Sequence, residues 1–394
     1  MKITRVEILT MNLEEATNWH PVIVRLHTDE GLTGVGEVGI AIGSGTAHSA
    51  GAGMAKNLAE QFVLGVDPFK TEMLWEEMFR SSFWGLGGGP VVYSGMSGID
   101  TAMWDIKGKA LGVPVYQLLG GKTNDNLRTY ASQIQFGWSE ARETLTTPEQ
   151  YADAARIAVA QGFDCVKIDP VILDREGNRG KTNLRRLLPP ALLSEFRDRI
   201  AAVRDAVGPE VDVILELHSL LSVANAIKLA EIWEEFNCLF YEEPVHYNNP
   251  ALHTMVAKNV KIPTAAGERI YTRWGYRPYF EQQAISVIQP DLGLVGGISE
   301  GKKICDYANT YDITVQVHTC SSPVSMAAAL QLEATIPNFM IHEHHTNAIK
   351  PYSIIICNEN YQPVNGRFAV PDLPGLGVTL NEDIVAKADR IVVE

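Results

Sequence analysis

Hydrophobic and polar positions repeat with a regular period through the second half of the chain. Between residues 211 and 318, five short apolar runs close in turn with Glu216, Glu242, Glu268, Asp291 and His318. These closing residues follow one another at intervals of 23 to 27 positions, and stretches with helical spacing separate the runs. An apolar run followed by a helical stretch at this period is typical of the βα unit of a parallel barrel.

The same rhythm extends in both directions and predicts eight strands. LRTYAS (127–132) and FDCVKID (163–169) are expected as the first two strands, and FMIHEH (339–344) as the eighth. Seven helices are expected between the strands, near 148–161, 194–207, 223–236, 249–258, 273–283, 299–311 and 323–336. The carboxyl ends of barrel strands face one mouth, so we expect the polar residues placed there to converge on one site.

The first 125 residues and the end of the chain have a different pattern. Residues 1–10 and 21–28 alternate in the manner of strands, and helical spacing follows at 46–64, 69–80 and 97–112. The tail contains short strand-and-turn segments that a barrel does not require. We therefore predict an α+β capping domain over residues 1–125, a barrel over 126–355, and a tail over 356–394 that returns to the cap.

Two irregular segments interrupt these patterns. The charged stretch 170–195 is longer than most βα loops, which indicates a functional or mobile loop. The glycine-rich GLGGGP (85–90) follows no strand directly and is not a G-x-G-x-x-G fingerprint that opens a helix. We interpret it as a loop near a pocket rather than as a phosphate cradle.

Composition narrows the class of protein. The length of 394 residues and the hydrophobic content of 46% suit a barrel with a second domain. A net charge of −14 disfavours nucleic acid or an anionic membrane as a partner. The N-terminal residues lack the apolar core of a signal peptide, and the five cysteines form no C-x-x-C pair. We expect a reduced, cytoplasmic enzyme with a small-molecule substrate.

Three carboxylates at consecutive strand ends predict a site for a hard metal ion. Oxygen ligands without cysteine favour Mg²⁺ over Zn²⁺, and Glu216, Glu242 and Glu268 are the candidate ligands. A single glutamate at such a position would more often be an ion-paired residue. Because side chains alternate along a strand, only one of Glu242 and Glu243 is expected to face the site, and the spacing favours Glu242.

Acid–base groups accompany these carboxylates. His318 and Asp291 close neighbouring strands, and an aspartate bonded to an imidazole fixes its tautomer and leaves the other nitrogen as a general base. A structural histidine is the alternative. His218 lies two residues after Glu216, on the same face, and is a candidate second acid or base. Further polar residues end the second and eighth strands, namely Lys167, Asp169 and Glu343.

These groups together suit abstraction of a proton α to a carboxylate. Such a proton is weakly acidic, so the enolate that forms needs a metal ion and nearby donors for its stabilisation. Lys167 is a candidate base or charge clamp, although it could also pair only with a carboxylate. Glu343 could exchange a hydrogen bond with a substrate anion.

At this point the chain resembles the enolase superfamily, and specifically its mandelate racemase-like branch. The resemblance covers nearly the whole length and includes the stretches SGIDTAMWDIKGKALGVPVYQLLGG (97–121), YEEPV (241–245), QPDLGLVGGISE (289–300) and PDLPGLGV (371–378). It implies a modified (β/α)₇β barrel under an α+β cap that the C-terminal tail completes. It also implies Mg²⁺ on the three glutamates, and Glu343 as the hydrogen-bond partner of the substrate carboxylate.

One departure from this branch changes the expected reaction. Racemases of the branch carry K-x-K at the end of the second strand, whereas this chain has Lys167-Ile168-Asp169. Its E-L-H at 216–218 is similar to the carboxylate-x-His of acid-sugar dehydratases that resemble galactonate and mannonate dehydratases. That likeness implies His318 as the base that removes the C2 proton and His218 as the acid that assists departure of the C3 hydroxyl. The product would be a 2-keto-3-deoxy acid.

Two other functions remain open from the sequence: a racemase or epimerase of an α-hydroxy acid, and a binding or regulatory protein without turnover. The family implies that loops near 12–20 and 45–55 close the pocket, and that the protein forms a symmetric homo-oligomer, often an octamer. Asp169 and pocket residues from several loops are candidates for substrate binding, chiefly Trp19, His20, Trp84 and His344, with Asn18, His48 and His345 as further polar candidates.

Overall fold

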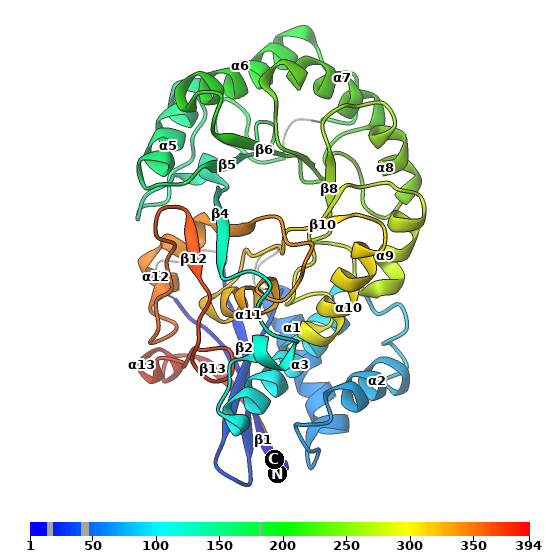
Figure 1. Cartoon of the computed structure of the whole chain (residues 1–394), viewed down its shortest axis with the longest axis vertical. Coiled ribbons are helices and arrows are strands. Elements are labelled where there is room, and N and C mark those ends of the chain that lie inside the picture. The colour runs from blue at the N-terminus through cyan, green and yellow to red at the C-terminus, as the bar shows by residue number, and fades with distance from the viewer. Residues whose placement is uncertain (14–18, 41–46, 181–182) are drawn as a thin grey trace.

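Eight parallel strands form the barrel that occupies the middle of the chain (Figure 1). The computed structural model describes residues 1–13, 19–40, 47–180 and 183–394. The neighbouring strands β4 to β10 follow sequence order, β11 pairs with β4, and a bridge between Val315 and Phe339 closes the ring. The strands are β4 (Asn126–Ser132), β5 (Cys165–Ile168), β6 (Asp212–Glu216), β7 (Tyr241–Glu242), β8 (Thr264–Ala266), β9 (Val287–Ile288), β10 (Thr314–Val315) and β11 (His342–His345).

In the described part of the chain, seven crossover helices surround this ring, as the sequence predicts. Several begin at side-chain caps, for example Thr147, which forms a capping box with Gln150, and Ser222, which accepts a hydrogen bond from Asn225 N. In the described residues the short α12 (Pro351–Ile354) stands after β11 in place of a full crossover helix, so the predicted (β/α)₇β barrel is confirmed. The seven helices are α5 (Pro148–Ala160), α6 (Pro190–Val207), α7 (Val223–Trp233), α8 (Pro250–Ala257), α9 (Thr272–Glu281), α10 (Gly297–Asn309) and α11 (Pro323–Glu333).

The barrel interior has an apolar layer directly beneath the polar residues of the mouth. Side chains two positions apart on a strand share a face. Four fully buried pairs follow this rule, each with an apolar residue first and a charged residue second: Cys165 and Lys167, Ile214 and Glu216, Phe240 and Glu242, Ile341 and Glu343. The apolar members pack together and form the floor on which the charged members stand.

An antiparallel sheet with helices forms the cap. Its strand order is β13-β1-β2-β3, with β1 (Ile3–Thr10), β2 (Val22–Thr28), β3 (Thr33–Val38) and β13 (Asp389–Val393). The tail thus returns to the cap through β13, but β12 (Arg367–Ala369) pairs with barrel strand β4 instead. The remaining elements are α1 (Ala47–Leu58) with a π-turn at Ala59–Val63, α2 (Thr71–Ser81), α3 (Gly89–Leu111), α4 (Val115–Leu118) and α13 (Glu382–Val385).

Helix α3 begins earlier than the sequence pattern predicts. It starts at Gly89 rather than near residue 97, because Pro90 at its first turn suits a helix start. The first residues of the glycine-rich segment form a loop in which Gly85 O accepts a hydrogen bond from the Tyr93 hydroxyl at 2.8 Å. Gly87 N and Gly88 N donate to that hydroxyl, at 3.0 and 3.1 Å.

Buried carboxylates of the cap fix it over the mouth of the barrel. Glu37 on β3 accepts hydrogen bonds from Ser322 N and Ser322 Oγ at the start of α11. Asp100 on α3 accepts from Ser299 N at 2.9 Å and Ser299 Oγ at 2.6 Å in the first turn of α10. Burial raises the pKa of both carboxyls to about 7 against these hydrogen bonds. Since these helices begin just after strand ends, the cap lies on the side where the polar residues gather.

Two expectations from composition concern chemistry outside the site. All five cysteines are free thiols, as the absence of paired spacing indicates. Within the described part of the chain, no helix combines the length and the apolar character that crossing a bilayer requires.

Candidate active site

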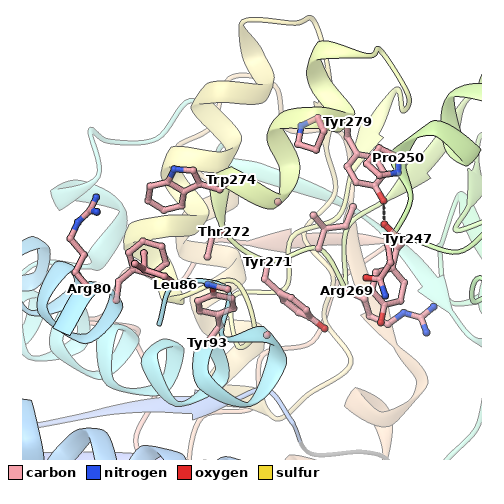
Figure 2. A pocket seen from close by; sticks show the side chains of 17 residues that line it. Arg80, Leu86, Tyr93, Tyr247, Pro250, Arg269, Tyr271, Thr272, Trp274 and Tyr279 are labelled. Atoms are coloured by element: carbon pink, nitrogen blue, oxygen red, sulfur yellow. Dashed lines mark hydrogen bonds between the residues drawn. The ribbon is translucent and has the colours of Figure 1, made fainter. Parts of the chain in front are cut away.

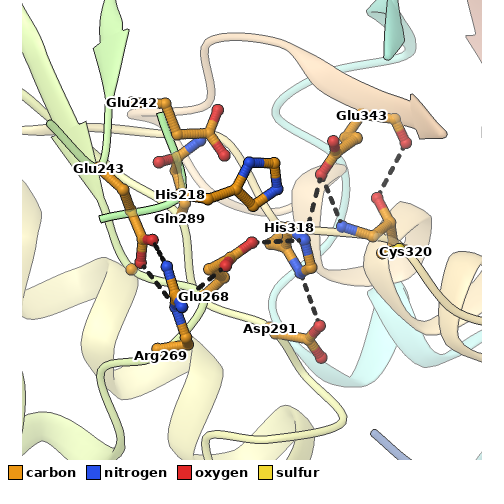
Figure 3. Close-up of polar contacts among 12 residues, drawn as sticks. His218, Glu242, Glu243, Glu268, Arg269, Gln289, Asp291, His318, Cys320 and Glu343 are labelled. Carbon is orange, nitrogen blue, oxygen red and sulfur yellow. Dashed lines mark hydrogen bonds and ion pairs between the residues drawn. The ribbon is translucent and has the colours of Figure 1, made fainter. Parts of the chain in front are cut away.

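A cavity of about 590 Å³ opens at the barrel mouth beneath the cap. Trp19 and Gly39 line it from the cap, and His218, Glu268, Asp291 and His318 line it from the barrel. Figure 3 shows the histidines and carboxylates of this region gathered where the strands end. Four residues that the sequence pattern places on separate strands, His218, Glu268, Asp291 and His318, therefore meet at one cavity, whereas Glu216, Glu242, Lys167 and Glu343 are not among its lining residues.

The carboxylates reach this mouth in two ways. Glu216 and Glu242 are the last residues of β6 and β7, pair with each other in the ladder and are fully buried. Glu268, Asp291 and His318 lie two or three positions beyond β8, β9 and β10, although the sequence pattern predicts them on the strands. After β9, Pro290 has no N–H for a ladder hydrogen bond, so the strand ends before Asp291.

His318 lies between two carboxylates. Its Nδ1 is 2.7 Å from Asp291 Oδ2, and its Nε2 is 2.9 Å from Glu268 Oε2. Burial lowers the pKa of His318, but the negative charges of Glu268 and Glu343 outweigh burial and raise the pKa well above its usual value. The Asp291 contact orients the imidazole, and Nε2 faces Glu268, which lines the cavity together with His318.

His218 forms a second dyad, with Asp169. The distance from His218 Nδ1 to Asp169 Oδ2 is 2.5 Å. The other oxygen of Asp169 accepts hydrogen bonds from Val171 N and Ile172 N, both at 2.8 Å, so this carboxylate is fixed. Burial lowers the pKa of His218, but Glu216 and Asp169 raise it to about 10. Asp169, which we expected to bind substrate, is fully buried and instead orients His218.

Lys167 connects three of the predicted site glutamates. Its Nζ lies 2.8 Å from Glu343, 3.0 Å from Glu242 and 3.5 Å from Glu216. Burial lowers the pKa of Lys167, but these carboxylates raise it well above its usual value. Lys167 therefore joins the carboxylates of Glu343, Glu242 and Glu216 in one buried ion-pair cluster.

Glu343 is held in place from both sides. It accepts hydrogen bonds from Ser132 Oγ at 2.5 Å and Thr319 N at 3.0 Å. Burial raises its pKa, but Lys167 and His318 outweigh burial and lower the pKa below its usual range. These contacts fix the Glu343 carboxyl beside Lys167 and His318.

The adjacent Glu242 and Glu243 are both fully buried but have different partners. Strand β7 ends at Glu242, and Glu243 has a positive φ of 43°. The Glu243 carboxylate forms an ion pair with Arg269 and accepts a hydrogen bond from Ser219 Oγ at 3.0 Å. Glu243 is thus engaged by partners of its own, while Glu242 joins Glu216 and Lys167.

The predicted metal ligands meet the chemical requirement for a hard cation in part. Among the described residues, Glu216 Oε2 is buried and forms no hydrogen bond, and its charged neighbour is the Lys167 ammonium at 3.5 Å, while Oε1 accepts from Leu217 N and His218 N. A buried carboxylate oxygen without a hydrogen bond, beside Glu242, suits a divalent cation. Glu268 instead pairs with His318 and Arg269, and across the described residues no three His, Cys, Asp or Glu side chains form a ligand group.

The candidate substrate-binding residues from the loops occupy different places. Trp19 lines the cavity, and His20 packs its ring on His48 at 4.7 Å between centroids. His344 is buried away from the cavity lining and its Nε2 lies 3.1 Å from Gln362 Oε1, whereas His345 does line the cavity. Trp84 is 68% exposed and is not part of the cavity wall. Asn18 lies outside the described residues.

Three arginines of the cavity wall were absent from the sequence-based candidates: Arg142, Arg179 and Arg269. Arg269 follows Glu268 directly and pairs with it at 3.2 Å. Arg179 belongs to the charged stretch 170–195. The unusual length and charge of that stretch are the sequence features from which a cavity residue could have been expected there.

A second cavity, of about 600 Å³, lies between the cap and helices α8 and α9 (Figure 2). Its wall is mainly aromatic and includes Tyr93, Tyr247, Tyr271 and Trp274, together with Leu86 from the glycine-rich loop. Its described lining contains no histidine and no carboxylate. Of these two cavities, only the first is lined by histidines and carboxylates of the described chain.

Comparison with known proteins agrees with this geometry. A family model described as mandelate racemase / muconate lactonizing enzyme, N-terminal domain, matches residues 4–120, and one described as enolase C-terminal domain-like matches residues 150–384. A D-galactonate dehydratase of Variovorax paradoxus is 32% identical, with 99% of this chain and 95% of the relative covered.

Solved structures match the whole chain as well. A member of the enolase superfamily from Salmonella Typhimurium is 50% identical with a TM-score of 0.96, and all of both chains is covered. A mandelate racemase/muconate lactonizing enzyme from Jannaschia sp. is 30% identical with a TM-score of 0.87, over 98% of this chain and 97% of the other. The resemblance seen in the sequence is thereby confirmed: the chain belongs to the mandelate racemase/muconate lactonizing enzyme family of the enolase superfamily.

Proposed function

We propose that this protein is a Mg²⁺-dependent dehydratase of a sugar acid, an aldonate or aldarate. The observation that carries the proposal is the pair of histidine–aspartate dyads, His318–Asp291 and His218–Asp169, at one cavity. The full-length similarity to proteins named D-galactonate dehydratase supports a hydro-lyase of this class.

In this proposal the two histidines divide the proton transfers. His318 Nε2 takes the C2 proton, because Asp291 holds Nδ1 while Nε2 faces Glu268 in the cavity lining. His218 gives a proton to the C3 hydroxyl, which leaves as water as the C2–C3 double bond forms. The resulting enol becomes a 2-keto-3-deoxy acid by taking a proton at C3, so one molecule of water is lost overall.

Three glutamates would hold the metal ion: Glu216, Glu242 and Glu268. A bound Mg²⁺ would stabilise the negative charge that develops on the substrate carboxylate when the C2 proton leaves. Lys167 supports this arrangement because it holds Glu216, Glu242 and Glu343 in one cluster. Glu343 would be the hydrogen-bond partner of the substrate carboxylate.

An epimerase is the second candidate function. Two dyads that face one cavity could also exchange the α-proton without loss of water. The two functions differ in the group with which His218 exchanges a proton: the C3 hydroxyl in a dehydratase and C2 in an epimerase.

The test is a product assay. Purified protein with Mg²⁺ is incubated with a stereochemical panel of aldonic and aldaric acids, and 2-keto-3-deoxy acids are detected by derivatisation and NMR. Formation of such a product from one or two members supports dehydration. Exchange of the C2 proton or inversion at C2 without this product favours the epimerase, and complete inertness contradicts both functions.

A further inference from the structure

Two arginines stand on the cavity wall without acidic partners. Arg142 lies in the loop between β4 and α5, and Arg179 lies in the stretch 170–195 between β5 and α6. Their guanidinium groups lie over the same ring, Phe136, at 5.5 and 4.1 Å from its centroid. Across the described residues, neither guanidinium forms a hydrogen bond or an ion pair with a carboxylate. Both side chains are exposed toward the open space of the cavity.

Hydrogen bonds from a buried lysine fix the loop that carries Arg142. The buried Lys350 donates hydrogen bonds to the carbonyl oxygens of Ser139 and Ala141, the latter at 2.8 Å, which fixes the loop that carries Arg142. Burial and the charge of Arg142 lower the pKa of Arg179. Two adjacent like charges are unfavourable alone, and an anion between them would offset the repulsion.

Several other arginines of the described chain, in contrast, form ion pairs with carboxylates. Arg175, four positions before Arg179 in the same stretch, pairs with Glu195 at 2.7 Å. Arg128 and Arg199 likewise pair with carboxylates, at 2.7 and 2.9 Å. In a chain of net charge −14, unpaired arginines beside catalytic histidines are available for a ligand.

We propose that Arg142 and Arg179 bind a second anionic group at the far end of the sugar acid, and that the substrate is therefore a doubly anionic sugar acid rather than a simple aldonate. This inference rests on the proposed function. A guanidinium binds carboxylate or phosphate through two parallel hydrogen bonds, so both a terminal carboxylate, as in an aldarate, and a terminal phosphate have the required chemistry. A cavity of about 590 Å³ has room for such a ligand.

The experiment measures kcat and KM for aldaric acids, aldonic acids and 6-phosphoaldonates with the wild type, Arg142→Gln and Arg179→Gln. Arg175→Gln is the matched control, because Arg175 lies in the same stretch but outside the cavity wall. We expect each cavity variant to raise KM for the doubly anionic substrate about 10- to 100-fold with little change in kcat. The KM for an aldonate should not change in the cavity variants, and Arg175→Gln should leave the KM for every substrate unchanged. Arg179→Lys should bind the doubly anionic substrate more tightly than Arg179→Gln does.

The outcomes separate the inference from the proposed function. The inference is supported if the wild type prefers an aldarate or a 6-phosphoaldonate over aldonates and the cavity variants lose this preference. The preferred substrate then identifies the anion. Equal turnover of aldonates, with no effect of either variant, overturns the inference while dehydration stands. If no sugar acid is turned over, dehydration fails, and calorimetric titration with galactarate and galactonate then decides. Binding of galactarate that Arg179→Gln weakens supports the inference, and equal affinity for both acids overturns it.

Discussion

Asp169 holds His218 by a contact of 2.5 Å between Oδ2 and Nδ1, in the same manner as Asp291 holds His318 at 2.7 Å. The two dyads come from opposite parts of the barrel, one from β5 and β6 and the other from the loops after β9 and β10. Asp169 occupies the position where racemases of this branch are expected to carry a lysine. In this chain Asp169 is instead the partner of a histidine.

Asp169→Asn tests this positioning. The amide can still meet His218, but it no longer favours the imidazole orientation and charge that an aspartate supports. We expect kcat for dehydration to fall about 10-fold or more, while exchange of the C2 proton through His318 continues. Dehydration followed by NMR and exchange measured in deuterated water provide the two readouts.

Asp198→Asn, an exposed change on α6, serves as the control for that experiment. If Asp169→Asn lowers exchange and dehydration by the same factor, Asp169 supports the whole site rather than His218 alone. That result would contradict its assignment to the second dyad.

Glu242→Gln and Glu243→Gln form a matched pair for the metal. Glu242 lies with Glu216 and Lys167, whereas Glu243 is engaged by Arg269 and Ser219. We expect Glu242→Gln to weaken Mg²⁺ binding about 10-fold or more by calorimetric titration, and Glu243→Gln to weaken it much less. Chelation should abolish wild-type turnover, and added Mg²⁺ should restore it. A larger loss in Glu243→Gln would assign the ligand to the other glutamate.

Glu37→Gln tests the link between cap and barrel through pH. Burial raises the pKa of Glu37 from 4.5 to about 7, so the folded state holds this proton more tightly than the unfolded chain. Its contribution to the free energy of unfolding is therefore full below pH 4.5 and is lost as the pH rises through 7. Urea unfolding from pH 4.5 to 8 should show a smaller decline in the variant. Parallel curves for the two proteins would exclude Glu37 as the titrating group.

The sequence alone predicts much of this site, for a physical reason. A parallel barrel repeats its βα unit at a nearly constant period, so Glu216, Glu242 and His318 can be assigned to one mouth from their spacing. The apolar floor follows from the same alternation, since Cys165 and Ile214 lie two positions before Lys167 and Glu216.

The contacts that the sequence does not predict depend on loops and on local turns. Asp169 meets His218 across two strands, and no pattern within either strand indicates this pair. The backbone of Glu243 leaves the extended conformation, so strand alternation does not predict its contacts with Ser219 and Arg269. Arg142 and Arg179 reach the cavity from separate loops whose path is set by tertiary packing.

The central claim is that His318 removes the C2 proton and His218 expels the C3 hydroxyl. It is tested most directly by ¹H NMR in deuterated water with Mg²⁺ and the sugar acid that the wild type consumes. We predict that His318→Asn neither exchanges the C2 proton nor forms product, with rates at least about 10²-fold lower.

In the same experiment His218→Asn should continue to exchange the C2 proton while product formation stops. Circular dichroism of both variants confirms that they are folded. Full dehydration by His218→Asn, or continued C2 exchange by His318→Asn, would contradict the assignment of the two histidines.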